Sequence, residues 1–350
     1  MYEMDWLNNI ADLQDELRER TYVPREASTF VLRERGTERP IRGEQVRDRV
    51  VEHSLNDNVV VPSIRPYLIY DNGASLAGKG VAFTRRELVK DLVSYYNRYG
   101  NRGYVLLIDF KKYYDNIRHD VLMQQFWRYV HDDTALWLLE TIISGFQVDV
   151  SYMDDAEYAH CMDTVFSSLE YWKVDKPLLT GQKYMAKHLD IGNQTSQSAG
   201  VLYPTPIDNY VKIVRGVKYY ARYMDDSYVF HPDREYLKAL MADIIRECAK
   251  LGITVNAHKT HVAKLSDRWR FLQIQYSLTD TGRIVQKIHP KRLTERRRLM
   301  KKLAPRMTDR DFTVWVDAWI KSNRKYMSKQ QYANIKALEQ TLRKETKCTR

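Results

Sequence analysis

The sequence predicts an α+β fold in which helices surround short antiparallel strands. Its clearest strand is residues 104–108, a run of apolar residues that ends at Asp109. Residues 218–223 and 228–231 have the apolar and aromatic pattern of a hairpin. From Pro290 onward the pattern is helical and strongly basic. Segregated helices and antiparallel hairpins are typical of this fold class.

The N-terminal region is expected to contain a hairpin and a helix. Two short strands, at residues 29–33 and near Ile41, face each other across a charged turn. A helical pattern at residues 45–60 should end at Pro62, which lacks a backbone donor. This region therefore predicts a strand pair followed by a helix.

Three further elements are expected along the chain. Thr84 is placed to cap a helix that ends near Tyr99. Residues 196–214 have a helical pattern, and residues 253–255 read as a short strand. The mixed, polar stretch at 146–187 is interpreted as an insertion.

The charge balance favours a polyanionic partner. The 350-residue chain carries 56 Lys and Arg against 45 Asp and Glu, a net charge of +11. Such a protein attracts phosphates and releases their counterions on binding. The alternative is a basic protein that its charge keeps soluble, and composition alone does not separate the two.

The cysteines and the apolar runs argue against several classes of protein. Cys161, Cys248 and Cys348 are far apart and have no CxxC spacing, which disfavours a zinc site and a disulfide framework. No apolar run approaches the roughly 20 residues that span a bilayer. The acidic N-terminus does not resemble a signal peptide. We therefore expect a cytoplasmic protein without a membrane partner.

Three carboxylates are placed as nucleotidyl transfer requires. This reaction uses two divalent ions about 3.5–4 Å apart, one at the attacking hydroxyl and one at the leaving pyrophosphate. Hard cations take carboxylate oxygens as ligands. Asp109 follows a buried strand, and Asp225 and Asp226 form the tip of a hairpin. Taken singly, such aspartates are more often cap or turn residues.

A second copy of the hairpin-tip sequence provides an internal control. Residues 152–155 repeat the letters Tyr-Met-Asp-Asp, but no apolar strand follows them. Only the copy at 223–226 lies between two apolar, aromatic-rich strands. We interpret the first copy as coincidence.

Five segments, in order along nearly the whole chain, resemble the motifs of reverse transcriptases. They are Asp109-Phe-Lys-Lys-Tyr-Tyr114-Asp-Asn-Ile, Ile191-Gly-Asn-Gln-Thr-Ser-Gln197, Tyr223-Met-Asp-Asp226, Leu251-Gly-Ile-Thr-Val-Asn-Ala-His-Lys259-Thr and Arg270-Phe-Leu-Gln-Ile274. Each segment is weak by itself, and the order carries the resemblance. It implies an RNA-directed DNA polymerase with the right-hand architecture of fingers, palm and thumb.

The resemblance implies roles for the carboxylates and one lysine. Asp109 and Asp225 would hold two Mg²⁺ ions, with Mn²⁺ as the alternative. Asp226 would assist them, and the backbone carbonyl of Phe110 would join the ligands. Lys259 would give a proton to the leaving pyrophosphate.

A nucleotide pocket is also implied. Tyr114 falls at the steric-gate position, where a ring would clash with a ribose 2′-hydroxyl. Ile191 and Gly192 open the second motif and would lie beside the incoming dNTP. Because arginines clamp phosphate oxygens in a bidentate fork, the N-terminal hairpin would contribute a triphosphate clamp. Its members would be Arg39 with Arg33 or Arg35.

The primer and template would be held by residues from several motifs. Phe271 and Leu272 would belong to the hairpin that grips the primer end. The basic C-terminal helix would follow the backbone of the RNA–DNA hybrid along its wide minor groove. The implied contacts are Gln197, Tyr223, Met224, Phe271, Leu272, Arg292 and Arg296.

The same resemblance divides the chain into subdomains. Residues 1–103 would be the N-terminal part of the fingers. Residues 104–287 would be the palm, with an interleaved fingers segment and the insertion near 146–187. Residues 288–350 would be a basic helical thumb.

The second motif resembles the enzymes of diversity-generating retroelements, which mutagenise a copied gene segment at template adenines. In that family an aliphatic residue replaces glutamine beside the base pair, so Ile191 implies low fidelity. The implied partners are template RNA, the RNA–DNA hybrid, dNTPs, a structured non-coding RNA and a small basic accessory protein.

Two departures from that type leave other readings open. The loop before Gly78 reads Ala74-Ser-Leu-Ala77 where the type has a Cys-Arg-Lys cluster, and the insertion is longer than expected. Reverse transcriptases of antiphage defence systems, and other bacterial and phage lineages, share the Gly-x-x-x-Ser-Gln pattern.

Other classes of protein also remain open. A polymerase restricted to DNA templates, or a metal phosphodiesterase, would use a similar Asp-Asp pair. A phosphodiesterase has no need for a gate at Tyr114 or a clamp at Arg39. The non-enzymatic alternative is an RNA-binding scaffold with a decayed site, which the presence of all three carboxylates disfavours.

Overall fold

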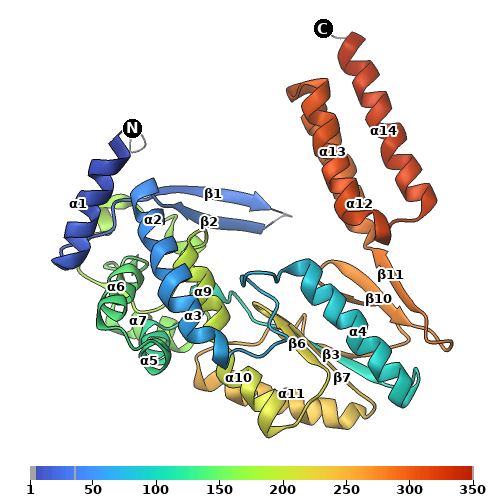
Figure 1. The fold of residues 1–350 in the computed structure, drawn as a ribbon, viewed down its shortest axis with the longest axis horizontal. Coiled ribbons are helices and arrows are strands. Elements are labelled where there is room, and N and C mark those ends of the chain that lie inside the picture. The colour runs from blue at the N-terminus through green and yellow to red at the C-terminus, as the bar shows by residue number, and fades with distance from the viewer. Residues whose placement is uncertain (1–4, 35–36, 349–350) are drawn as a thin grey trace. The chain divides into compact units, whose positions relative to one another are not determined.

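The computed structural model describes residues 5–34 and 37–348 and confirms the predicted α+β class (Figure 1). The chain divides into two compact units, and each is described by itself. Unit 1 comprises Met1–Leu88, Leu106–Val229 and Arg234–Val262. Unit 2 comprises Val89–Val105, Phe230–Asp233 and Ala263–Arg350.

The expected N-terminal hairpin is present. After helix α1 (Trp6–Arg18), strands β1 (Ser28–Glu34) and β2 (Thr37–Gly43) pair in antiparallel register. Leu32 lies opposite Arg39 in this register. Arg33 lies on β1, and Arg39 and Arg42 lie on β2, so both strands of the hairpin carry basic residues.

The following helix does not end at Pro62, which corrects the prediction. Helix α2 (Val46–Leu55) continues through a π-helical turn (Asn56–Val60) into α3 (Val61–Ile64). Pro62 lies in the first turn of α3, where proline is tolerated. The π turn changes the hydrogen-bond pattern just before it and accommodates the proline.

The predicted cap at Thr84 is also wrong. Helix α4 (Val81–Tyr99) begins before Thr84. The Thr84 hydroxyl donates to the carbonyl of Gly80 at 3.1 Å, because a threonine inside a helix can bond back to the preceding turn.

A four-stranded sheet carries the predicted central strands in the order β6-β7-β3-β8. Its members are β6 (Tyr220–Tyr223), β7 (Asp226–His231), β3 (Tyr104–Asp109) and β8 (His261–Lys264). Strand β3 is buried over residues 105–109, as its apolar run predicted. The expected strand at 253–255 is wrong, since only Val255 pairs, with Phe110, as an isolated bridge.

Helices and the insertion complete unit 1. The helical pattern at 196–214 is interrupted at Pro204, and the part after the break is α-helical to Asn209 and π-helical beyond it. The unit also contains α5 (His119–Tyr129), α6 (Asp133–Ser144), β4 (Val148–Asp149), α7 (Asp155–Asp163), α8 (Ser168–Tyr171), β5 (Tyr184–Met185), α9 (Gln194–Leu202), α10 (Thr205–Asn209), a π-helical turn (Tyr210–Val214) and α11 (Arg234–Lys250). The insertion has its own small core around Phe166 and Met185.

Unit 2 contains a three-stranded sheet and a helical C-terminal part. The strands are β9 (Trp269–Phe271), β10 (Ile274–Leu278) and β11 (Ile284–Ile288), and the helices are α12 (Pro290–Leu303), α13 (Asp309–Asn323) and α14 (Lys329–Cys348). The basic helical part from Pro290 onward was expected. None of the helices in the described part of the chain is long and apolar enough to cross a membrane.

Candidate active site

Asp109 lies at the end of β3 and is held from both sides. The residue is 5% exposed. Asn256 donates from Nδ2 to Oδ1 of Asp109 at 2.7 Å, and Lys259 Nζ pairs with Oδ2 at 2.9 Å. The Asn256 backbone also donates to the Asp109 carbonyl at 2.8 Å. The loop turns around Asp109 instead of forming the strand predicted at 253–255.

Asn256 was missed as a site residue. The signal was available in the fourth motif, where Asn256 lies three positions before Lys259. A polar residue directly after an apolar run is a common turn residue, so sequence alone gave it no partner.

The tip of the β6–β7 hairpin is tied to the end of β3. Tyr223 pairs with Asp226, so Met224 and Asp225 form a two-residue turn. Met224 has a φ of 53°, a left-handed value that such tight turns require. The Phe110 backbone N–H donates to the Asp225 carbonyl at 3.2 Å. These contacts bring Asp225 beside Asp109.

The charges at this site oppose one another. Burial and the neighbouring Asp109 carboxylate raise the pKa of Asp225, while Lys259 and Arg39 act in the opposite direction. Burial lowers the pKa of Lys259, but the hydrogen bond to Asp109 and the three aspartate charges outweigh it and raise that pKa. Like charges in a partly buried place are unfavourable without a cation between them.

The donor set fits a hard divalent cation. Carboxylate oxygens are ligands that Mg²⁺ takes, and the neighbouring Asp109 and Asp225 carry them. Asp226 and the Phe110 carbonyl are the further predicted ligands. Across the described ranges, no group of three or more His, Cys, Asp or Glu side chains forms a ready-made metal site. The fit rests on the mutual repulsion of Asp109 and Asp225, which Lys259 relieves only in part.

A buried ion pair supports the hairpin tip, and sequence reasoning missed it. Arg222 and Asp208 are both 0% exposed and 2.7 Å apart. Arg222 also donates to the Met224 carbonyl at 3.1 Å and to the Val201 carbonyl at 2.9 Å. Tyr220 donates its hydroxyl to Asp208. The only sequence signal was an arginine in an otherwise apolar strand.

Tyr114, the predicted gate residue, lies between α9 and the hairpin tip. Its hydroxyl is 3.7 Å from the Met224 sulfur. Gly200 of α9 makes room for the ring, because a Cβ there would lie 2.8 Å from the Tyr114 hydroxyl oxygen. Burial and the nearby Asp225 charge raise the pKa of Tyr114. The ring therefore stays neutral beside the carboxylates.

The second motif packs against the N-terminal hairpin. The Arg42 backbone of β2 donates to the Ile191 carbonyl at 3.4 Å. Gly192 has a φ of 127°, and a Cβ there would lie 3.3 Å from the Arg42 carbonyl oxygen. This close approach at a left-handed conformation accounts for the glycine.

The predicted triphosphate clamp is divided by the structure. The positive charge of Arg39 acts to lower the pKa of Asp225. Arg33 forms an ion pair with Glu38 across the hairpin at 2.7 Å. Arg35 lies outside the described residues.

Three of the predicted primer and template contacts lie together in unit 1. Gln197 is exposed on α9, and its Oε1 accepts from the Ser75 hydroxyl at 3.1 Å. Tyr223 and Met224 pack against a small apolar cluster that includes Val201 of the same helix. The loop at 71–80 thus lines this part of the site.

The other four predicted contacts belong to unit 2. Phe271 is 3% exposed, and Leu272, with a φ of 43°, opens the turn between β9 and β10. Arg292 and Arg296 lie on α12. The Arg296 guanidinium stacks 3.2 Å from the centre of the Trp315 ring and donates to the Trp315 carbonyl. Arg296 is therefore engaged within its own helical bundle.

The second Tyr-Met-Asp-Asp copy has a local structural role. The Asp154 side chain caps α7 by accepting from the Glu157 backbone at 2.8 Å. Asp155 pairs with Lys183 at 2.7 Å on the surface. These are the cap and solvated-turn roles that paired aspartates commonly have.

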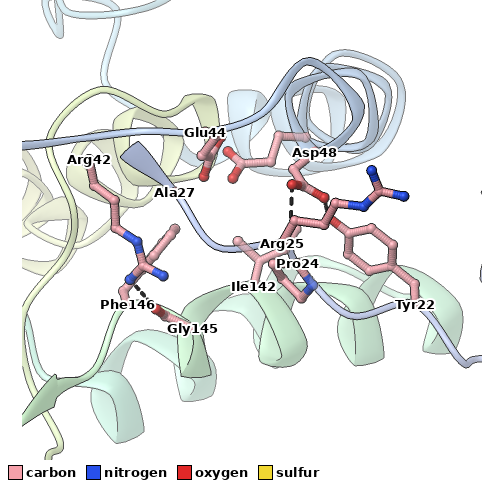
Figure 2. A pocket seen from close by; sticks show the side chains of 11 residues that line it. Tyr22, Pro24, Arg25, Ala27, Arg42, Glu44, Asp48, Ile142, Gly145 and Phe146 are labelled. Carbon is pink, nitrogen blue, oxygen red and sulfur yellow. Dashed lines mark hydrogen bonds between the residues drawn. The ribbon is translucent and has the colours of Figure 1, made fainter. Parts of the chain in front are cut away.

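A separate pocket lies between the end of β2, α2 and α6 (Figure 2). None of the predicted site residues lines it. Burial, a hydrogen bond to Glu52 and nearby carboxylates raise the pKa of Glu44 to about 9, so its carboxyl is neutral at pH 7. Arg42 crosses the pocket to the Gly145 carbonyl, as Figure 2 shows. Arg42 and Glu44 thus make polar contacts between the end of the hairpin and the helices that line the pocket.

The fold and these side chains define a polymerase-like class of protein, and comparison with known proteins gives the family. Residues 33–276, more than half of the chain, match the family described as Reverse transcriptase (RNA-dependent DNA polymerase). The chain belongs to this family. The match confirms the predicted family and polymerase fold, and members of the family use divalent metal ions.

One solved structure similar to this chain is a telomerase from Candida albicans, in complex with the TWJ fragment of telomeric RNA. The identity is 12% and the TM-score 0.46, over 91% of this chain and 59% of that chain. This chain therefore spans less than two thirds of that telomerase. No curated protein matches the sequence.

Proposed function

We propose that this protein is an RNA-directed DNA polymerase that makes cDNA by two-metal nucleotidyl transfer. The observation that carries the proposal is the tie between Phe110 and the Asp225 carbonyl, which sets two repelling carboxylates side by side. The family match supports RNA as the template class.

In this proposal the chain's own residues divide the work. When bound, two Mg²⁺ or Mn²⁺ ions supply activation of the primer 3′-hydroxyl and neutralisation of the pyrophosphate charge. Asp109 and Asp225, with Asp226 and the Phe110 carbonyl, hold them. Lys259 Nζ gives a proton to the leaving pyrophosphate. Arg39, with Arg33, binds the triphosphate oxygens.

The proposed subdomains follow the expected boundaries. Residues 1–103 form the N-terminal part of the fingers, 104–287 the palm with the insertion near 146–187, and 288–350 the thumb. Gln197, Tyr223 and Met224 contact the template–primer, and the turn at Phe271 and Leu272 grips the primer end. Arg292 contacts the backbone, whereas Arg296 stabilises the thumb through Trp315.

Template choice tests this function against its rivals. Purified protein is given the same primer on an RNA or a DNA template of one sequence, with Mg²⁺ and dNTPs. Extension on RNA supports the proposal, and extension on DNA alone supports a DNA-templated polymerase. Shortening of the labelled strands supports a phosphodiesterase. Binding without extension or cleavage supports an RNA-binding scaffold.

Replacing Tyr114 with valine is expected to relax sugar selection. Loss of the ring removes the clash with a 2′-hydroxyl, and one such group changes discrimination by about 10–200-fold. Single-nucleotide insertion of dCTP and CTP by Tyr114→Val measures the change. Tyr113→Phe, which loses only a hydrogen bond to the Gly200 carbonyl, is the control. Equal discrimination in both variants would remove Tyr114 from the gate role.

We further propose that the enzyme is error-prone and of the retroelement type, with a structured RNA and a small basic accessory protein as partners. Ile191 supports this proposal. Its carbonyl accepts a hydrogen bond from the Arg42 backbone of β2, and it falls at the position where an aliphatic residue would replace the glutamine beside the base pair. A reverse transcriptase of an antiphage defence system is the second candidate, favoured by the long insertion.

Ile191→Gln is expected to reduce errors opposite template adenine by about tenfold, the effect of roughly 1.4 kcal/mol in base selection. Sequencing of cDNA products measures the errors, and Ile213→Gln at an exposed position is the control. An error rate that is equal at all four template bases and unchanged by Ile191→Gln would favour the defence enzyme.

A further inference from the structure

His188 lies buried between two carboxylates of unit 1. Its Nδ1 is 3.0 Å from Asp115 and its Nε2 is 3.1 Å from Asp190. Burial lowers the pKa of His188, but the hydrogen bonds to both aspartates outweigh it and raise the pKa to about 9. At neutral pH the ring is therefore an imidazolium, and both nitrogens donate charge-assisted hydrogen bonds.

Each of the two aspartates adjoins a wall of the proposed nucleotide pocket. Asp115 follows Tyr114 directly, and Asp190 directly precedes Ile191. The Leu189 backbone donates to the Tyr114 carbonyl at 2.9 Å, so the two segments also pair through their main chains. The imidazolium thus joins the segment that carries Tyr114 to the one that carries Ile191.

The same cluster reaches the N-terminal hairpin. Arg42 of β2 donates from its guanidinium to Asp190 at 3.1 Å. Its backbone donates to the Ile191 carbonyl. Through Asp190, His188 is therefore connected to the strand that carries Arg39, the proposed triphosphate ligand.

The insertion supports the cluster from the other side. The Ser168 hydroxyl of α8 donates to Asp115 at 2.7 Å. The Asn116 side chain accepts from the Phe166 backbone at 2.8 Å and donates back to its carbonyl at 3.1 Å. The insertion is thus packed against the turn that presents Tyr114.

The backbone of His188 is strained. Its φ is 122°, a conformation that glycine adopts readily and other residues rarely do. Such conformations persist where the surroundings over-determine them, often at functional sites. Because His188 keeps this conformation although it has a side chain, we infer that its contacts with Asp115 and Asp190 outweigh the backbone strain.

We propose that His188 is a positioning residue of the nucleotide pocket. Clamped between Asp115 and Asp190, it fixes the separation of Tyr114 and Ile191 and so sets the preference for deoxynucleotides over ribonucleotides. The inference rests on the proposed polymerase function and gives the insertion a role as the outer support of the gate.

Kinetics of His188→Gln test the proposal, with His160→Gln on the exposed face of α7 as the matched control. A misplacement of 1 Å in a substrate-positioning group can lower the efficiency of the reaction about 100-fold. A smaller shift is therefore expected to raise the KM for dCTP about tenfold. The ratio of dCTP to CTP use should fall by about tenfold. Because a loss of binding that is equal in the ground state and the transition state leaves kcat unchanged, kcat should change less than about twofold. A lower melting temperature with unchanged discrimination would show a merely structural role.

A second readout does not depend on activity. A 3-fluorotyrosine at position 114 gives a ¹⁹F resonance that reports the surroundings of the gate ring. His188→Gln is expected to shift or broaden this resonance, and His160→Gln to leave it unchanged. Asp190→Asn, which removes one arm of the clamp, replaces His188→Gln if that variant does not fold. An unchanged resonance would overturn the proposal, whereas absence of extension by the unmodified protein would count against the polymerase function alone.

Discussion

Replacing Asp225 with asparagine is expected to abolish primer extension and to raise the melting temperature of the metal-free protein. The carboxylate would hold divalent ions whose charge stabilisation is worth several kcal/mol, or about 1000-fold or more in rate. Stability should move in the opposite direction, because burial and Asp109 raise the pKa of Asp225. A raised pKa means that the ionised carboxylate is unfavourable in the folded chain, and asparagine removes this cost.

The difference in melting temperature between Asp225→Asn and the wild type should depend on pH. As the pH falls from neutrality toward the ordinary aspartate pKa, the wild-type Asp225 becomes protonated and its unfavourable charge disappears. The melting temperatures of the variant and the wild type in EDTA should therefore differ most near pH 7 and converge at acidic pH. Added Mg²⁺ should stabilise the wild type more than the variant.

The second Tyr-Met-Asp-Asp copy supplies the control for this experiment. Asp155→Asn changes an aspartate of the same four-letter sequence, at the position that matches Asp226, and affects only a surface ion pair with Lys183. Its activity and melting temperature should match the wild type. Loss of extension in Asp155→Asn, or destabilisation of the metal-free protein in Asp225→Asn, would contradict the assignment of the two copies.

Asp208→Asn is expected to be the most destabilising substitution in unit 1. It leaves the Arg222 guanidinium buried without its carboxylate, and breaking a fully buried pair costs about 3–5 kcal/mol. Denaturant unfolding measures the loss. Asp15→Asn, which breaks an exposed pair with Arg18, should cost only about 0–1 kcal/mol.

A double variant separates stability from function at this pair. Asp208→Leu with Arg222→Met replaces the two charges by apolar side chains, which is often neutral or stabilising. It should recover most of the stability but little of the extension activity, because the Met224 carbonyl loses its donor at the hairpin tip. Full activity in the double variant would show that Arg222 has no part in placing Asp225.

Sequence was most informative where the site is built from contiguous segments. The buried run before Asp109 and the apolar strands around Asp225 predicted the two carboxylate positions, because strand period and turn chemistry are local properties. The β1–β2 hairpin was predictable for the same reason. The order of the five motifs then identified the family, which no single motif could do.

The supporting contacts could not be predicted, because each joins residues far apart in the chain. Asn256 contacts Asp109 across 147 positions, and His188 contacts Asp115 across 73. The expected strand at 253–255 failed for a related reason, since its backbone and Asn256 turn around Asp109. The predicted helix end at Pro62 and the predicted cap at Thr84 were wrong because both residues are tolerated inside a first helical turn.

Primer extension on an RNA template tests the central claim most directly. The wild type and Asp225→Asn are compared on a primed RNA with dNTPs and Mg²⁺, after EDTA, and after Mg²⁺ is restored. The wild type should produce full-length cDNA, lose this activity with EDTA and regain it with Mg²⁺, and Asp225→Asn should produce none. Extension by Asp225→Asn at the wild-type rate, or a wild type that extends only on DNA, would contradict it.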